Sequence, residues 1–305
     1  MARWNGRGKG VPKRMLKIIA TYDAGQLTAV KTGVLFDHNN NFAMKQVLIV
    51  GAGHHFPEGP FGFLGAMQEY ERVHARALFF LPVDYSALAA AASGYNLTPI
   101  LELEDNEKEM ITTHKTLFAR QCERQFISHS VHDSDEEWSR DVLMKESRFA
   151  DLMLVSAEFP YLREALHDAE CPVLVVPENF STPEHLFMAY DGSRESLYAI
   201  KQFCYLFPGL TDLPTEILYV HDDATDNIPD LASLQEFSRL KFDSMSFSKL
   251  HFPVREYFAT WISEKQHVLL VSGSYGRSPV SYLGKRSFVE DIIHAGQLPV
   301  FIAHR

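Results

Sequence analysis

Two diverged copies of one strand–helix–strand pattern occupy most of the sequence, and this internal repeat limits the fold more than any other feature. The apolar run Val47–Val50 corresponds to Leu186–Ala189 at an offset of 139 residues. The same offset carries Leu78–Leu81 onto Ile217–Val220, so strand, helix and second strand run without a gap in both copies. In the second copy the helix between the strands has one apolar stripe, made by Leu197, Ile200, Cys204 and Phe207.

The first copy is longer than the second between its second and fourth strands. Leu152–Ser156 matches Val268–Ser272 at an offset of 116, which leaves 23 extra residues in the first copy. These residues lie around the alanine-rich run Ala87–Ala92 and a charged helix that we predict near Asn106–Arg120.

The second copy is longer before its last strand. Cys171–Val176 matches Leu298–Ala303 at an offset of 127, which leaves 11 extra residues in the second copy. We place the third strands at Gln125–His129 and Ser248–Phe252, and we interpret Ser134–Glu137 as a capping box that opens the next helix.

Each copy therefore reads as five short apolar strands alternating with helices, the pattern of a parallel sheet covered on both faces. The predicted fold class is α/β, with two tandem doubly wound five-stranded parallel sheets. The stretch Pro177–Glu184 breaks regular structure and separates a first domain, 44–178, from a second, 184–305.

Residues 1–43 differ from the rest in charge. They carry seven lysines and arginines against two aspartates, so their net charge is +5 and the remainder of the chain accounts for −15 of a total of −10. No apolar core follows the basic start, which disfavours a signal peptide. We interpret this segment as a disordered or artefactual extension, with a transit peptide as the weaker alternative.

The overall charge of −10 argues against nucleic acid or an anionic membrane as partner, since both attract a basic surface. No apolar run reaches the ~18 residues of a membrane helix. The cysteines Cys122, Cys171 and Cys204 show no metal or disulfide spacing, which is typical of reduced cysteine in a cytoplasmic protein.

A glycine-rich loop follows the fourth strand of the second copy and begins Gly273-Ser-Tyr-Gly276. Such a turn, leading to a helix that we expect over 287–294, would present backbone N–H groups and a positive dipole to an anion. It is not a Walker loop, because the pair Gly284-Lys285 precedes an arginine. The alternative is that the glycines only let the chain turn. Other groups available to a phosphate are Arg277, Lys285, Arg286 and Ser287.

Together, Tyr190–Ser196, this loop and the closing Leu298–Ala303 resemble the universal stress protein family, in its tandem two-domain form. The resemblance covers residues 44–305 and is sharper in the second copy. It implies an adenine nucleotide alpha hydrolase-like sheet of strand order 3-2-1-4-5, in which strands one and four flank the reversal.

The resemblance also implies a ligand, ATP or AMP, with Mg accompanying ATP. In the family pattern G-x2-G-x9-G-[ST], Gly273, Gly276 and Ser287 match, and Arg286 replaces the third glycine. That arginine either fills the space needed for close phosphate approach or contacts the phosphate itself. The implied site further contains Asp191, Gly192 and Ser193 near adenine and ribose, and Val220 in the base pocket.

The first copy lacks the residues that the implied nucleotide site requires. Ala52 stands where the second copy has Asp191, and the glycine loop is missing. We expect the first copy to bind no nucleotide and to serve as a structural partner, in an intrachain pseudo-dimer that is able to form a homodimer.

Two pairs of histidines are candidate metal ligands. His54-His55 and His129-x-x-His132 lack a third ligand at a recognisable spacing, so solvated loop residues are the preferred interpretation. A polar loop is likewise preferred for His221–Asp223.

Three functions follow in order of preference. The first is a non-enzymatic, cytoplasmic stress-response module whose second domain binds ATP or AMP. The second is a protein-interaction module with no nucleotide site. The third is a slow ATP-hydrolysing enzyme, ranked last because no general base or carboxylate pair is evident beside the loop.

Overall fold

The computed structural model describes the chain from residue 44 onward, with gaps. The described residues are 44–53, 55–92, 97–132, 136–220, 227–250, 261–262, 265, 267–273, 292–293 and 298–304. They belong to one unit that runs from Ala43 to Arg305. The predicted extension at 1–43 lies outside the described residues.

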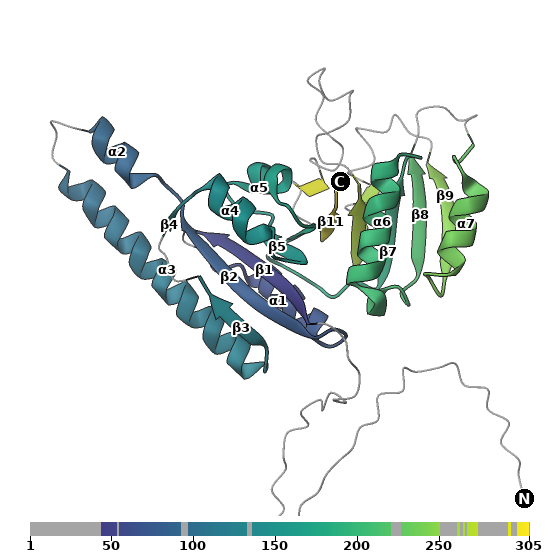
Figure 1. The fold of residues 1–305 in the computed structure, drawn as a ribbon, viewed down its shortest axis with the longest axis horizontal. Helices are drawn as coiled ribbons and strands as arrows, with labels where there is room; N and C mark the ends of the chain where they lie inside the picture. The colour runs from purple at the N-terminus through teal and green to yellow at the C-terminus, as the bar shows by residue number, and fades with distance from the viewer. Residues whose placement is uncertain are drawn as a thin grey trace, which may run out of the picture. The chain divides into compact units, whose positions relative to one another are not determined.

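The described strands form an eleven-stranded, mainly parallel sheet (Figure 1). The first half contributes β1 (Lys45–Ala52), β2 (Val73–Leu81), β3 (Ser128–Val131), β4 (Glu136–Glu137), β5 (Leu152–Ser156) and β6 (Val173–Val176). The second half contributes β7 (His185–Tyr190), β8 (Thr215–Val220), β9 (Met245–Leu250), β10 (Val268–Ser272) and β11 (Val300–Ile302). The order is β3-β2-β1-β5-β6-β11-β10-β7-β8-β9, and β4 pairs with β2 beside this path.

The α/β class and the parallel pairing agree with the sequence prediction, but the prediction of two sheets is replaced by one continuous sheet. The two halves join where β6 and β11 pair antiparallel, with Phe301 opposite Leu174. Pairing at this point gives the last strand of each half a hydrogen-bonded neighbour, which removes two exposed edges. The stretch 177–184 contains no helix or strand and connects the halves.

The fourth strands were predicted with the right bounds, because Leu152–Ser156 and Val268–Ser272 are buried throughout and read as unbroken apolar runs. The third strands were misplaced. The preceding helix continues to Arg124 and its following turn includes Phe126 at φ 57°, so β3 begins only at Ser128. The strand β9 begins at Met245, three residues before the predicted start.

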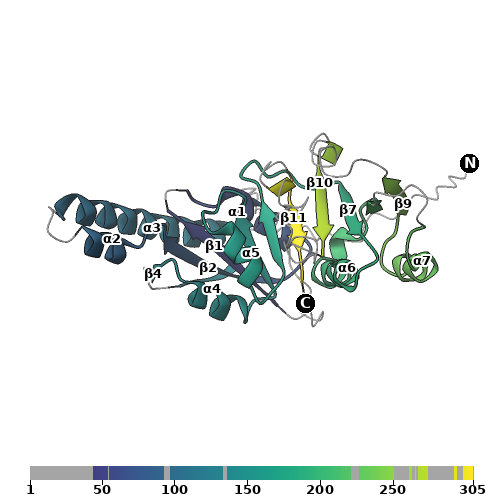
Figure 2. The same cartoon turned by 90° about the horizontal axis from the view of Figure 1, so that it is seen from above.

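Helices cover both faces of the sheet (Figure 2). One face is covered by α1 (Glu58–Gln68), α3 (Thr98–Arg124), α6 (Arg194–Leu206) and α7 (Leu231–Arg239). The other is covered by α4 (Arg140–Ser147) and α5 (Leu162–Asp168). On α6, Ile200 and Cys204 are buried and Leu197 packs partly buried against the same core, as the predicted stripe requires.

The extra residues of the first half form α2 (Tyr85–Ala91) and the start of α3. The helix α2 packs against α3 beyond the end of β2, and α3 then runs back along β2 and β3 (Figures 1 and 2). The helix predicted near Asn106–Arg120 lies inside α3, and most of the alanine-rich run lies in α2. The capping-box prediction was wrong, because Glu136 and Glu137 form the short strand β4. The helix after it begins at Arg140, and its cap is Ser139, whose hydroxyl accepts a hydrogen bond from the Val142 N–H at 3.4 Å.

An aromatic cluster packs over the joint between the halves. Phe207, which follows α6, lies edge-on to Phe63 of α1 at a centroid distance of 5.7 Å and to Phe301 of β11 at 5.9 Å. Phe203 of α6 contacts the Phe207 and Phe301 rings, and Phe63 also contacts Phe180 of the connecting stretch. Rings from both halves therefore share one buried core.

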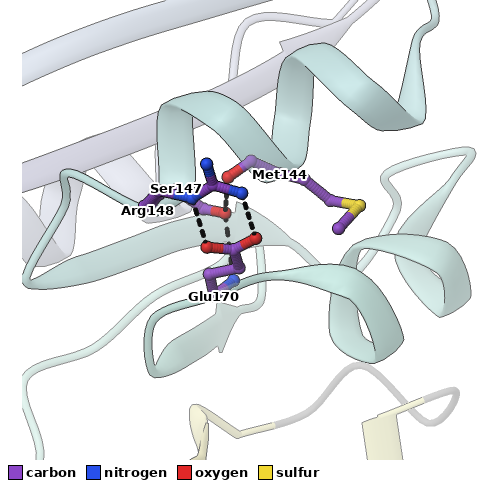
Figure 3. A network of polar contacts seen from close by, with 4 residues as sticks. All are labelled: Met144, Ser147, Arg148 and Glu170. Atoms are coloured by element: carbon purple, nitrogen blue, oxygen red, sulfur yellow. Dashed lines mark hydrogen bonds and ion pairs between the residues drawn. The ribbon is translucent and has the colours of Figure 1, made fainter.

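On the opposite face, a polar network fixes the end of α4 to the turn before β6 (Figure 3). The Arg148 guanidinium donates two hydrogen bonds to the Glu170 carboxylate, at 2.6 and 2.7 Å. The Ser147 hydroxyl accepts from the Glu170 N–H at 3.0 Å and donates to the Met144 carbonyl at 3.0 Å. Because Arg148 and Glu170 are partly exposed to solvent, their contribution is orientation more than stability.

The three cysteines are buried and form no disulfide. Burial raises the pKa of Cys122 and Cys171 to about 12 and that of Cys204 to about 11, so all three thiols stay protonated near neutral pH. In the described part of the chain, no helix combines the length and the apolar character that a membrane crossing requires.

The joint gives a stability prediction. Phe207→Ala removes a ring that is 2% exposed and touches both halves, so it should lower the free energy of unfolding by about 3–5 kcal/mol in denaturant titrations. The control is Tyr205→Ala, two residues away and 55% exposed, which should change it by less than about 1 kcal/mol. Equal effects of the two substitutions would contradict a shared core at the joint.

The edge strand β3 pairs in parallel with β2, and a histidine side chain of β2 adds contacts to β3. Both ring nitrogens of His74 lie within hydrogen-bond distance of serine hydroxyls of β3, 2.9 Å from Ser128 and 3.1 Å from Ser130. Burial lowers the pKa of His74 below 6.5, and the neighbouring His129 and Arg76 lower it further.

This lowered pKa predicts acid sensitivity. As the pH falls below about 6.5, the unfolded chain binds the proton first, so the contribution of His74 is complete above that pH and is lost as the pH falls through the folded-state pKa. Urea unfolding at pH 8 and pH 5.5 should therefore show a smaller pH dependence in His74→Gln than in the wild type. His185→Gln, at an exposed histidine, should keep the wild-type dependence.

Candidate functional site

The candidate site lies at the edge of the sheet where β7 and β10 end. These strands are parallel neighbours, with Val271 opposite Met188, so Asp191 and Gly273 leave the sheet on the same side. Strand β8 flanks β7 with Tyr219 opposite Tyr190, which brings Val220 to this edge as well. Ligands of open α/β sheets bind beyond such carboxyl ends.

The turn after β7 leads directly into the first turn of α6. The Asp191 carboxylate accepts a hydrogen bond from the Ser193 N–H at 2.9 Å. Ser193 is the N-cap of α6, and its hydroxyl accepts from the Ser196 N–H at 3.1 Å. The Ser196 hydroxyl donates to the Ser193 carbonyl at 3.0 Å, so this short turn is held by its own side chains.

Asp191 is exposed at this edge and ionised at neutral pH. Partial desolvation raises the pKa of its carboxyl. Hydrogen bonds with Ser193 and Ser196 outweigh that effect, and the pKa lies below its usual value. The site therefore presents a negative charge and hydrogen-bond acceptors beside the N-terminus of a helix.

Two glycines are required by the close packing of this edge. Gly192 has φ +82°, and a Cβ there would lie 2.7 Å from the Pro229 ring. A Cβ on Gly273 would collide with the backbone of Glu195 and Ser196, in the first turn of α6. Gly273 thus brings the start of the loop after β10 against the N-terminus of α6.

The corresponding edge of the first half is covered by aromatic side chains. Ala52 ends β1 and is partly buried, and it packs against the same core cluster as Trp138 and Tyr161. The Trp138 and Tyr161 rings are stacked at a centroid distance of 4.3 Å, and the Tyr161 hydroxyl donates to the Pro82 carbonyl at 2.6 Å. Since Tyr161 follows β5 and Pro82 follows β2, this contact passes over the end of β1, which lies between them.

Four of the predicted site residues are thus brought together at one edge: Asp191, Gly192, Ser193 and Gly273. Val220 ends β8, opposite Leu250 of β9. The remaining predicted residues lie outside the described residues, namely Gly276, Arg277, Lys285, Arg286 and Ser287. Sequence reasoning missed Pro229, Trp138 and Tyr161, because their roles depend on contacts between distant segments that no local pattern signals.

The histidines weighed as metal ligands have other contacts. The His129 ring packs edge-on to Phe118, and His132 lies 3.4 Å from the Arg76 guanidinium. Among the residues that the structure describes, no group of three or more His, Cys, Asp or Glu is arranged to hold a metal. His54 and the His221–Asp223 stretch lie outside the described residues.

An apolar groove lies elsewhere, between α1 and the short 3-10 helix η1 (Pro208–Leu210). Its volume is about 360 Å³ including the open mouth, and Phe63, Met67 and Phe207 are among its lining residues. Because α6 begins at the Asp191 edge and ends beside η1, this groove is at the opposite end of the helix. It belongs to the joint between the halves.

Comparison with solved structures finds the same fold in a universal stress protein from Archaeoglobus fulgidus DSM 4304. The TM-score is 0.61 at 16% sequence identity, over 85% of this chain and 96% of that one. A functionally unknown protein from Pseudomonas aeruginosa PAO1 matches with a TM-score of 0.51 at 13% identity, over 86% and 93% of the two chains. No family model and no curated protein matches the sequence.

The glycine turns allow a matched test. Gly53 after β1 has φ +66° and Gly192 after β7 has φ +82°, so alanine at either position should cost about 1 kcal/mol of folding free energy from backbone strain. Gly192→Ala should cost about 1–3 kcal/mol more, because its Cβ meets Pro229 at 2.7 Å while that of Gly53 meets Pro82 at 3.3 Å. Denaturant unfolding of the two variants measures the difference, and a larger loss for Gly53→Ala would contradict the packing.

Proposed function

We propose that this chain is a tandem, cytoplasmic universal stress protein, a non-enzymatic stress-response module whose second half binds ATP or AMP. The observation that carries the proposal is the convergence of Asp191-Gly192-Ser193 and Gly273 on one strand edge, against the N-terminus of α6. The fold shared with the Archaeoglobus protein supports it.

The edge has the chemistry that a nucleotide requires. The ionised Asp191 can accept hydrogen bonds from the adenine amino group or the ribose hydroxyls. The loop that starts at Gly273 would hold the phosphates through backbone N–H groups, with Arg277, Arg286 and Ser287 adding charge and donors. Mg would accompany ATP and offset part of the charge of its phosphates.

The first half is proposed to act as a structural partner without a nucleotide. Ala52 offers no carboxylate, and Trp138 and Tyr161 pack over the strand end. The orders β3-β2-β1-β5-β6 and β9-β8-β7-β10-β11 support a 3-2-1-4-5 unit in each half, and the β6–β11 pairing supports an intrachain pseudo-dimer. A homodimer would use other surfaces, because these two edges are already paired.

Two other functions are distinguished by the same measurement. A protein-interaction module with no nucleotide site would fold normally and ignore ATP. A slow ATP hydrolase would release phosphate in a manner that depends on Asp191. The binding function ranks first because Asp191 is exposed at its strand end, while aromatic rings pack near the corresponding strand end of the first half.

The test is a thermal shift with ATP and Mg. At a hundredfold excess over Kd, the wild-type melting temperature should rise by about 5 °C. Asp191→Asn keeps an oxygen for the Ser193 N–H but removes the charge, and should lose most of the rise. Asp212→Asn, at an exposed turn after η1, should keep it.

No rise in the wild type at millimolar ATP would exclude the nucleotide function. An equal rise in the wild type and Asp191→Asn would show that the ligand binds without this carboxylate.

A further inference from the structure

The turn before α7 is tied to the end of β7 by one hydroxyl. Tyr190 is the last residue of β7, and its side chain is buried with only 4% exposed. Its hydroxyl donates a hydrogen bond to the carbonyl of Pro229, 39 residues later in the chain, at 3.1 Å.

That contact sets the position of the turn against the candidate site. The Pro229 ring packs directly on Gly192, leaving no room for a side chain there. The next residue, Asp230, has left-handed backbone angles, φ 50° and ψ 30°, and its side chain makes no capping hydrogen bond to α7. A non-glycine residue in this conformation is held there by its surroundings.

The Tyr190 hydroxyl remains a donor under all ordinary conditions. Burial raises the pKa of Tyr190, and the carboxylates of Asp230 and Asp191 raise it further. The hydroxyl is therefore protonated at neutral pH and available as a donor.

The first half contains an equivalent hydrogen bond from a tyrosine hydroxyl to a proline carbonyl, but its tyrosine comes from a different segment. There Gly53 has a positive φ, Pro82 packs beside it, and the Tyr161 hydroxyl donates to the Pro82 carbonyl. Tyr161 comes from the segment after β5 and lies over the strand end, where it stacks on Trp138. Tyr190 comes from the strand itself and belongs to the core cluster that α6 and α7 cover, while Asp191 next to it is exposed.

We propose that Tyr190 is a positioning residue of the ligand site. Its hydroxyl fixes the Pro229–Asp230 turn against Gly192, and this turn forms the rigid wall that contacts the nucleoside part of the ligand. This proposal rests on the proposed nucleotide function. It holds that the Pro229–Asp230 turn contacts the base and ribose and does not contact the phosphates.

The experiment compares Tyr190→Phe with Tyr161→Phe in the full chain. Each substitution removes one hydroxyl bonded to a proline carbonyl and keeps the ring, so both should lower stability by a similar amount. Calorimetric titration with ATP and Mg should show affinity about five- to tenfold weaker in Tyr190→Phe and unchanged in Tyr161→Phe. Tripolyphosphate with Mg, which lacks the nucleoside, should bind both variants and the wild type alike.

Hydrogen exchange gives a readout that needs no ligand. Amides of 227–234 should exchange faster in Tyr190→Phe than in the wild type or Tyr161→Phe. Unchanged exchange of these amides in Tyr190→Phe would show that the hydroxyl does not fix the turn, whichever ligand binds. Wild-type affinity for ATP in Tyr190→Phe, or equal weakening of ATP and tripolyphosphate, would overturn the positioning role alone. No ATP binding by the wild type would overturn the proposed function and this role with it.

Discussion

The antiparallel pairing of β6 and β11 is the contact on which the rest of the molecule depends. It joins two sets of parallel strands into one sheet and brings rings from both halves, including Phe63, Phe207 and Phe301, into a common core. Each half alone would expose the backbone of its last strand and an apolar face beside it. The halves therefore stabilise each other.

The two carboxyl edges show how one architecture supports different surfaces. In the second half, Asp191 is exposed, and the Tyr190 hydroxyl donates a hydrogen bond to the Pro229 carbonyl in the nearby turn. In the first half, alanine takes the place of the aspartate, and the stacked pair Trp138 and Tyr161 lies over the strand end. The first half thus has a small apolar residue at this position and aromatic rings nearby, where the second half has an exposed carboxylate.

The sequence pattern was most reliable where burial is complete on both faces. The fourth strands could be predicted to the residue because such strands are continuous apolar runs. The edge strands β3 and β9 are half exposed and carry serines and lysine, so their bounds were wrong. Glycines at 192 and 273 could be predicted as turns. Their closest neighbours, Pro229 and the first turn of α6, could not, because tertiary packing alone brings those segments together.

The direction of the joint has a consequence for communication within the chain. Strands run parallel within each half and antiparallel across the β6–β11 pair, so the carboxyl ends of the two sets of strands point in opposite directions and lie at opposite edges of the sheet. A molecule seated beside Asp191 cannot reach across to Ala52. The backbone ladder of β6 and β11 and the rings packed on it form a continuous path through which a displacement at one edge can reach the other.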